Sequence, residues 1–175
     1  SFREGMQQMT DGIARRLAHV ECGVQVTGVA RAADGTFVVA ATAGAGDVSR
    51  RARAVVLAGP AFAAAGIVGD LAPDAASALA AIEYAPIAVV AAAFRRGDVA
   101  HSCEGFGFLV PRKEERRVLG ALFSTSMFAN RGPDGVVLLT TFAGGKRNPE
   151  IAALPDAAVV EVALAELAAL VGAKG

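Results

Sequence analysis

Apolar residues near the start of the chain recur at the spacing of a helix. Met6, Met9, Ile13 and Leu17 lie three or four residues apart, so they share one face of a helix. Polar residues occupy the positions between them. The pattern predicts a helix over residues 6–18.

The next segment changes to the spacing of strands. Val24–Val29 alternates apolar residues with small or polar ones, and Thr36–Ala41 follows it across the turn Ala33–Gly35. An Asp-Gly pair readily adopts the backbone conformation of a tight hairpin turn. After a second turn at Gly44–Asp47, a third strand is predicted over Val48–Ala54.

The third strand runs into a continuously apolar segment, Val55–Ala58. Such a run is typical of a strand that is buried on both faces in a parallel sheet. Pro60 suits the start of a helix, which is predicted over Ala61–Val68. A further helix is expected from Pro73, with two apolar residues facing the core, Leu79 and Ile82.

The second half of the chain is predicted to form four strands and a long helix. The strands are expected at Ile87–Phe94, Gly107–Val110, Arg117–Ser124 and Val136–Phe142. The helix begins at Pro155, with an apolar stripe of Val160, Leu164, Leu167 and Val171, and with Glu161 and Glu166 off the stripe. Helices and strands are segregated along the chain, which favours an α+β fold of mixed or antiparallel sheets with flanking helices.

Composition excludes several classes of protein. The chain has 175 residues, of which 54% are hydrophobic, so it is neither a disordered tail nor a disulfide scaffold nor a collagen-like repeat. Its 17 Lys and Arg balance its 17 Asp and Glu, so binding of nucleic acid or anionic lipid would require a local charged patch. No apolar run reaches the ~20 residues of a membrane-spanning helix.

The residues that most often carry metal or nucleophilic chemistry stand alone in this sequence. Cys22 and Cys103 are far apart, and so are His19 and His101. We expect buried thiols in a reducing compartment and no metal site. The sequence contains no G-x-G-x-x-G after a strand, no P-loop, no nucleophile elbow and no H-E-x-x-H, so no catalytic residue is predicted.

Two local strings have the chemistry of a ligand site. Gly105–Pro111 combines glycines, which permit close approach, with flat apolar side chains that suit an aromatic or macrocyclic ligand. A core strand bounded by glycines is the alternative. In Arg112–Arg117 the arginines could hold ligand carboxylates, although its mixed charges favour a solvated loop. Gly144–Arg147 has the wrong spacing for a phosphate loop and is interpreted as a tight turn.

Six strings occur in an order that is specific to one family. They are Ser1–Met6, Ala54–Ala61, Ile82–Val90, Gly105–Pro111, Val118–Ser124 and Phe142–Gly145. Together they resemble the middle of bacterial protoporphyrinogen oxidases, and the resemblance covers nearly the whole chain. It implies an FAD-dependent flavoprotein of the amine-oxidase type that removes six electrons from a porphyrinogen with oxygen as acceptor. It further implies that residues 1–66 belong to the FAD-binding domain and residues 67–175 to the substrate-binding domain.

The resemblance also implies site residues. The residues matched to cofactor contacts are Val26, near the adenine, and Ala58, Gly59 and Pro60, at a strand end. Those matched to the porphyrinogen pocket are Phe106, Gly107, Leu109 and Phe142. Because the flavin carries the hydride in such enzymes, no catalytic side chain is implied here.

Family members begin with a Rossmann unit and end with a segment over the flavin, and neither is found in this sequence. We therefore interpret the chain as a central fragment that is inactive alone. The alternatives are a coproporphyrinogen III oxidase, another amine-oxidase-type flavoprotein, or a non-catalytic module with an apolar groove. A cytoplasmic location is expected, with peripheral association at the inner face of the membrane left open, and exposed apolar faces favour self-association.

Overall fold

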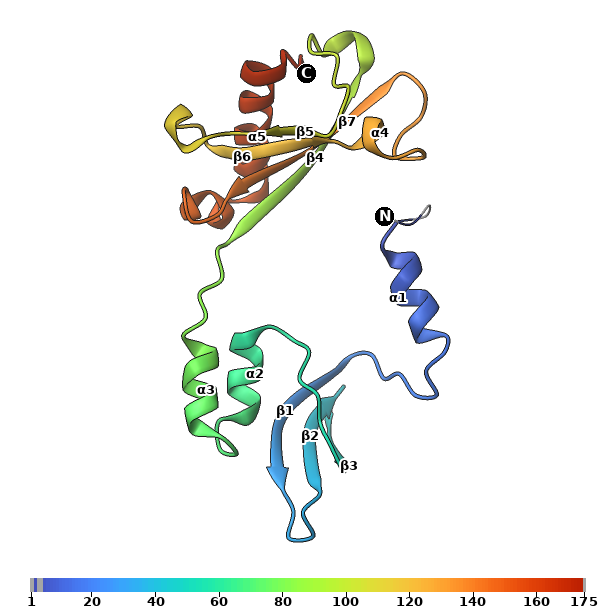
Figure 1. Cartoon of the computed structure of the whole chain (residues 1–175), viewed down its shortest axis with the longest axis vertical. Coiled ribbons are helices and arrows are strands. Elements are labelled where there is room, and N and C mark those ends of the chain that lie inside the picture. Colours follow the sequence, from blue (N-terminus) through green and yellow to red (C-terminus); the bar gives the residue numbers. More distant parts are fainter. Residues whose placement is uncertain (1, 3–4, 175) are drawn as a thin grey trace. The chain divides into compact units, whose positions relative to one another are not determined.

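The chain folds as two compact units, which are described separately (Figure 1). The computed structural model describes residues 2 and 5–174. Residues 13–84 form one unit, here called the meander unit, and residues 85–175 with residues 1–12 form the other, the sheet unit. This division follows Tyr84, whereas the sequence analysis placed its domain boundary after residue 66. The assignment of the two domains to cofactor and substrate stays a prediction.

The meander unit consists of a three-stranded antiparallel sheet and two helices. Its strands are β1 (Val24–Arg31), β2 (Phe37–Ala43) and β3 (Gly46–Ala52), in the order β1-β2-β3. The helices α2 (Ala61–Val68) and α3 (Pro73–Ala80) pack against each other, and α2 also contacts β1. The predicted hairpin and both predicted helix starts are confirmed.

The helix predicted over residues 6–18 is confirmed but shorter, α1 (Gln7–Ala14), and has no buried residue. Three local expectations in this half of the chain are wrong. Residues 54–58 form no strand, because no described strand pairs with them, and Val56 is 87% exposed. Ile82 lies beyond the end of α3 and is exposed rather than facing the core. Cys22 is exposed in the connection before β1, while Cys103 is buried as expected.

The sheet unit contains a four-stranded antiparallel sheet in the order β4-β7-β6-β5. The strands are β4 (Ile87–Arg95), β5 (Gly107–Leu109), β6 (Val118–Phe123) and β7 (Val136–Gly144). The helices are α4 (Ser124–Met127) and α5 (Asp156–Val171), and the 3-10 turns are η1 (Arg96–Asp98), η2 (Arg112–Glu114) and η3 (Pro149–Ala153). The α+β class with antiparallel sheets and flanking helices is confirmed.

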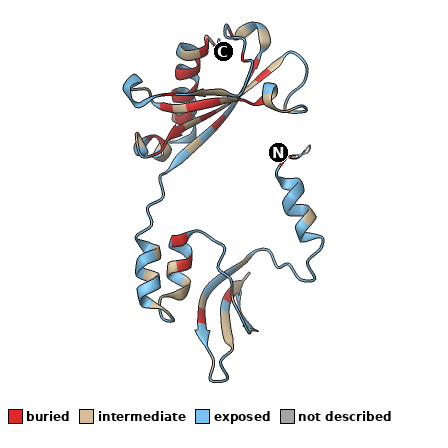
Figure 2. Cartoon of the chain, in the orientation of Figure 1, coloured by how far each residue is buried: buried red, intermediate tan, exposed pale blue. Residues whose placement is uncertain are grey.

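Helix α5 covers one face of this sheet. It packs on β4 and β7, and the buried residues follow these elements in Figure 2. Leu139 on β7 and Leu167 on α5 belong to one core cluster with Phe94 and Phe123. Alternate residues of a strand point to opposite faces, so only every second residue of β7 enters this core.

The buried side of α5 differs from the predicted stripe. Leu167 and Val171 are buried as expected, but Val160 and Leu164 are exposed. Glu166 is buried instead, where its carboxylate accepts a hydrogen bond from the Arg117 N–H at 3.2 Å and faces the Arg116 guanidinium at 3.6 Å. Other buried members of the helix are Val159, Val162 and Ala163. The charge of Glu166 is thus compensated by the two arginines that directly precede β6.

Strands β5 and β6 approach each other more closely than side chains would permit. A Cβ atom on Gly107 would lie 2.2 Å from the Ala121 carbonyl oxygen, and one on Gly120 would lie 2.3 Å from the Phe108 carbonyl oxygen. Both glycines have positive φ, +142° and +155°. These two positions therefore accept only glycine without a change in strand pairing.

Replacement of Gly120 by alanine should destabilise the chain by about 2 kcal/mol or more, because the new methyl group overlaps β5 backbone. Gly97→Ala is the matched control, because a Cβ atom at Gly97 meets nothing within 4 Å, and it should change stability by less than about 0.5 kcal/mol. Chemical denaturation measures both. Equal effects of the two substitutions would show that the β5–β6 contact is not close in solution.

The turn between β1 and β2 is stabilised by Asp34. Its carboxylate accepts hydrogen bonds from the Thr36 hydroxyl at 2.6 Å and the Thr36 N–H at 3.1 Å, and from Arg51 at 2.7 Å. These bonds, those from Thr36 above all, lower the pKa of Asp34. Its stabilising contribution is therefore present above the usual carboxyl range and is lost as pH falls through the lowered value.

Thr36→Val should raise the pKa of Asp34 toward its ordinary value, because it removes the hydroxyl donor and leaves the backbone donor. Carboxyl carbon chemical shifts followed through a pH titration measure this change. Ser49→Ala, on the same sheet, is the control and should leave the Asp34 titration where it is. An unchanged Asp34 pKa in Thr36→Val would contradict the assigned role of the hydroxyl.

Candidate functional site

The face of the four-stranded sheet that points away from α5 is the strongest candidate site. Directly paired residues of antiparallel strands point to the same side, so the register defines this face. Its two central rows are Leu109, Gly120, Phe142 and Val89, and Gly107, Leu122, Thr140 and Ala91. These eight residues are called the open face below.

The open face is apolar and accessible. Leu109 is 87% exposed and Val89 is 57% exposed, whereas Leu139 on the α5 side is fully buried. Gly107 and Gly120 bring no side chain to the face, so β5 and β6 contribute the side chains of Leu109 and Leu122 to its two central rows. The Thr140 hydroxyl lies 2.8 Å from the Ser124 hydroxyl, which satisfies one polar group within the face. An accessible apolar surface of this kind suits a ligand with a large apolar body.

Three of the four residues predicted to contact substrate lie together here. Gly107, Leu109 and Phe142 belong to the open face, although β5 and β7 are separated by β6. Phe106 precedes β5, where its carbonyl accepts a hydrogen bond from the Phe123 N–H at 3.1 Å, and its ring is 71% exposed. Whether these residues contact a substrate stays a prediction.

Leu122 is a candidate that the sequence analysis missed. It is paired with Gly107 on one side and with Thr140 on the other, which places it at the centre of the open face. The sequence signal that could have revealed Leu122 is the succession of two predicted strands, Gly107–Val110 and Arg117–Ser124, which are expected to pair in an antiparallel way. Once Gly107 is placed opposite β6, the residue directly across from it shares its face.

The predicted cofactor residues all belong to the meander unit. Val26 lies on β1, an edge strand of its sheet, next to a bulge at Thr27, which is left unpaired between Val26 and Gly28. Ala58, Gly59 and Pro60 are exposed in the segment that leads into α2, and α2 packs on β1. An edge strand has backbone groups that are not paired within its sheet. Whether Val26 and the segment Ala58–Pro60 contact a cofactor stays a prediction.

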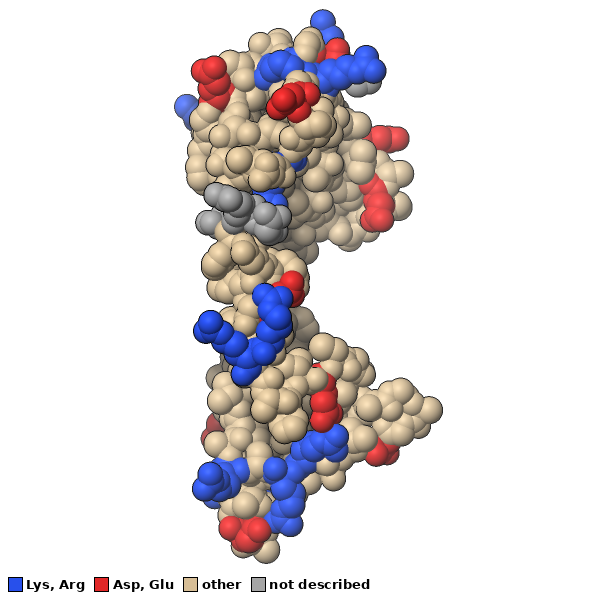
Figure 3. Space-filling model, turned by 90° about the vertical axis from the view of Figure 1, so that its right-hand side faces the viewer, with Lys and Arg blue, Asp and Glu red and all other residues tan. Residues whose placement is uncertain are grey.

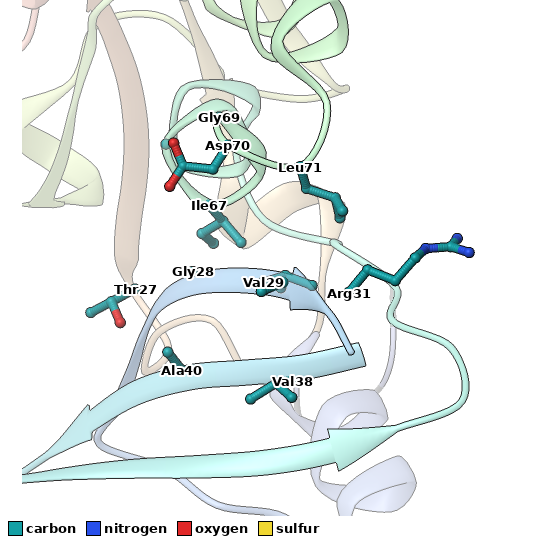
Figure 4. A pocket seen from close by; sticks show the side chains of 12 residues that line it. Thr27, Gly28, Val29, Arg31, Val38, Ala40, Ile67, Gly69, Asp70 and Leu71 are labelled. Atoms are coloured by element: carbon teal, nitrogen blue, oxygen red, sulfur yellow. The ribbon is translucent and has the colours of Figure 1, made fainter. Parts of the chain in front are cut away.

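A separate pocket of about 350 Å³ lies between the β1–β2 hairpin and the connection from α2 to α3 (Figure 4). Val29, Val38 and Ile67 line it with small residues around them. Asp70 and Arg31 also border it, and the Arg31 side chain extends away from the pocket in Figure 4. The Arg31 guanidinium lies over the Phe37 ring, 5.1 Å from its centre. The pocket contains none of the predicted site residues.

Charged residues form small groups rather than one large field. On the side drawn in Figure 3, small groups of charged side chains, several with basic and acidic members side by side, are separated by uncharged surface. Within residues 2 and 5–174, no three His, Cys, Asp or Glu side chains are grouped so that they could hold a metal ion. In the same part of the chain, no helix has both the length and the apolar character needed to cross a membrane.

The sequence similarity agrees with an apolar site that relies on a cofactor. Residues 2–175 match the profile of the family described as flavin containing amine oxidoreductase. The chain belongs to this family. Members of the flavin containing amine oxidoreductase family carry their redox chemistry on the flavin, so the apolar character of the open face is compatible with an oxidoreductase.

Several named relatives are porphyrinogen oxidases. The chain is 32% identical over 168 residues to a chloroplastic protoporphyrinogen oxidase of Oryza sativa subsp. japonica. The matched region covers 92% of this chain and 31% of that relative. It is 43% identical over 97 residues to a mitochondrial protoporphyrinogen oxidase of Nicotiana tabacum, covering 54% and 19%. It is 27% identical over 128 residues to coproporphyrinogen III oxidase of Bacillus subtilis, covering 73% and 27%.

The fold is also similar to a solved structure. A protein from Exiguobacterium sp. 255-15 matches with a TM-score of 0.79 at 19% identity, over 100% of this chain and 37% of that protein. At this identity the likeness concerns the fold alone. The chain spans about a third of the length of the curated relatives that match most of it.

Leu109→Ser should change stability by less than about 0.5 kcal/mol, because the leucine side chain is already in water. Leu139→Ala, on the α5 side of the same sheet, should cost about 2–5 kcal/mol through a core cavity. Chemical denaturation of the two variants measures the difference. A large loss in Leu109→Ser would mean that the open face is covered in solution, for example by a second copy of the chain.

Proposed function

We propose that this chain forms the substrate-facing part of an FAD-dependent porphyrinogen oxidase of haem biosynthesis, with protoporphyrinogen IX as substrate. The open face carries the proposal, because its exposed apolar residues offer an extended apolar surface on which a macrocycle could lie. The similarity to relatives named protoporphyrinogen oxidase supports the same substrate class.

The open face would orient the substrate and exclude water from it. Leu109, Leu122 and Phe142 present apolar groups from three neighbouring strands, so a tetrapyrrole lying on them would lose water from one side. The rigid antiparallel pairing holds these side chains in a fixed arrangement. In such a mechanism the chain contributes position and a low-polarity environment rather than a nucleophile or an acid.

FAD, when bound, would accept hydride from the porphyrinogen and pass electrons to oxygen. The residues of this chain that would hold it are Val26 and the segment Ala58–Pro60. The free edge of β1 and the exposed residues before α2 fit contacts with the adenine and other uncharged parts. The sequence has no glycine-rich phosphate turn after a strand, so these residues would supply only part of the FAD site.

Coproporphyrinogen III is the second candidate substrate, supported by the similarity to the Bacillus subtilis enzyme of that name. The two porphyrinogens share a macrocycle and differ in the number of carboxylate arms, so the open face does not separate them. Amine oxidation is less well supported, because an amine needs an aromatic cage and this chain contains one Tyr and no Trp.

The test uses the full product of the gene that encodes this chain, supplied with FAD. Porphyrin fluorescence is followed under air with protoporphyrinogen IX and, separately, with coproporphyrinogen III. Faster fluorescence growth with protoporphyrinogen IX is expected. Growth with neither substrate would contradict the proposal. A colourless protein that is indifferent to FAD and to porphyrins would favour the non-catalytic apolar-groove module.

Leu109→Arg in that protein should lower turnover at least about tenfold while FAD content stays unchanged, because it places a charge on an apolar substrate face. Leu109→Met preserves the apolar surface and is the control, with turnover within about twofold. Absorbance of the bound flavin and steady-state rates measure the two effects. Flavin content that falls in step with turnover would indicate a folding defect and not a substrate-face role.

Other sequence-based expectations stay predictions. These are a bacterial source, a cytoplasmic location with peripheral membrane association left open, and self-association through exposed apolar faces. The named relatives include chloroplastic and mitochondrial plant proteins as well as a Bacillus subtilis protein. Self-association would use apolar surface that the chain leaves exposed.

A further inference from the structure

A pocket with three cationic side chains lies where two strands of the sheet end. Its volume is about 330 Å³, and its lining residues are Arg112, Leu119, Lys146 and Arg147. Arg112 follows β5, while Lys146 and Arg147 follow β7. No carboxylate belongs to this lining, so the pocket concentrates positive charge in a chain whose formal net charge is zero. This set is called the cationic pocket.

The backbone holds the cationic pocket in place. Gly145 has a φ of +70°, and a Cβ atom there would lie 3.0 Å from a methyl carbon of Leu119. This tight turn brings Lys146 and Arg147 beside Leu119. One guanidinium nitrogen of Arg147 donates a hydrogen bond to the Val110 carbonyl at 3.0 Å. Arg147 is therefore anchored at one nitrogen, and a guanidinium has further N–H groups that can bind an anion.

The cationic pocket and the open face meet along β6, because Leu119 lines the pocket and the next residue, Gly120, belongs to the open face. Leu119 occupies the bulge of β6 between Val118, which is paired with Ala143, and Gly120, which is paired with Phe142. Val118 and Ala143 belong to a buried cluster on the α5 side, whereas Leu119 is not among the described residues that pack into the core clusters. The residues of β5 and β7 that lie on the open face nearest the pocket are Leu109 and Phe142.

We propose that the cationic pocket binds a carboxylate arm of the tetrapyrrole whose ring lies on the open face. This inference rests on the proposed function. Porphyrinogens carry carboxylates at the ends of flexible arms on the ring periphery. With the apolar ring on the open face, such an arm could reach a cationic group beside that face. Arg112 can bind a carboxylate through two N–H groups, and it is exposed on the turn η2.

The test measures equilibrium binding of mesoporphyrin IX, which has two carboxylates, and of its dimethyl ester, which has none. The full gene product is used, and porphyrin absorbance and fluorescence give the binding curves without turnover. Arg112→Gln should weaken binding of the diacid about tenfold at low salt and leave the ester within twofold. High salt should reduce the difference between diacid and ester, because ions screen the contact.

Lys113→Gln is the matched control. It removes the same charge at the next residue of η2, but Lys113 is exposed and does not line the pocket. It should leave diacid binding within twofold. Equal weakening by Lys113→Gln and Arg112→Gln would show a general charge effect and overturn the proposal. Equal weakening of diacid and ester by Arg112→Gln would show a structural role and overturn it as well.

Two further arms separate this inference from the proposed function. Leu109→Arg should weaken ester binding if the open face holds the ring, because the ester has no carboxylate that the new guanidinium could attract. Normal ester binding in that variant would contradict the proposed function itself. If ester binding depends on Leu109 while Arg112→Gln leaves diacid binding unchanged, the proposed function stands and the cationic pocket has no part in it.

Inorganic phosphate serves as a competing anion. If phosphate binds in an Arg112-dependent way without displacing the diacid, the pocket is a phosphate site and the proposal is wrong.

Discussion

One-sided burial of the four-stranded sheet is the constraint on which the sheet unit depends. Leu139 and its neighbours on the α5 side form the core, and the alternation of a strand forces the intervening residues onto the other side. In this chain those residues are apolar too, as Leu138 and Phe142 of β7 show. Apolar area left in water costs roughly 25 cal/mol per Å². A folded protein that keeps such a face accessible has a use for it as a binding surface.

Local pattern predicted the elements whose structure is decided locally. The hairpin of β1 and β2 depends on turn chemistry at Asp34, and α2 begins after Pro60, so both could be predicted from a few adjacent residues. The apolar run Val55–Ala58 was predicted as a strand and is not one. A strand needs a neighbouring backbone, and hydrophobic pattern says nothing about whether a neighbour is present.

The buried side of α5 shows a second limit of pattern reasoning. Alanine and valine occur on all sides of this helix, so several of its faces are almost equally apolar. The predicted face included Val160 and Leu164, which are exposed. Glu166 is buried because the Arg117 N–H and the Arg116 guanidinium compensate its charge. That compensation comes from residues some fifty positions earlier, and no helical periodicity reveals it.

Some residues of the candidate site could be predicted because the family resemblance names them. Their arrangement could not, because it depends on the register in which the strands pair. Gly107, Leu109 and Phe142 were named from the sequence, but only the pairing through β6 places them on one face and adds Leu122. The cationic pocket was harder to predict. Arg112 stood in a string of mixed charges, and Lys146 and Arg147 stood in what was interpreted as a tight turn. Their proximity depends on the close packing of Gly145 against Leu119.

An apolar face and a cationic border would act on a ligand in different ways. Burial of apolar area is not directional, so a flat ring on Leu109, Leu122 and Phe142 alone could rotate in the plane of the sheet without much loss of free energy. A carboxylate held by a guanidinium has a preferred direction and distance. The first interaction supplies affinity, and the second would select one rotation of the ring. Selection of one rotation decides which edge of a ring is presented for reaction, and it does so without any side chain that takes part in the chemistry. A site built in this way would need no acid, base or nucleophile in this chain, in keeping with a sequence that shows no such constellation.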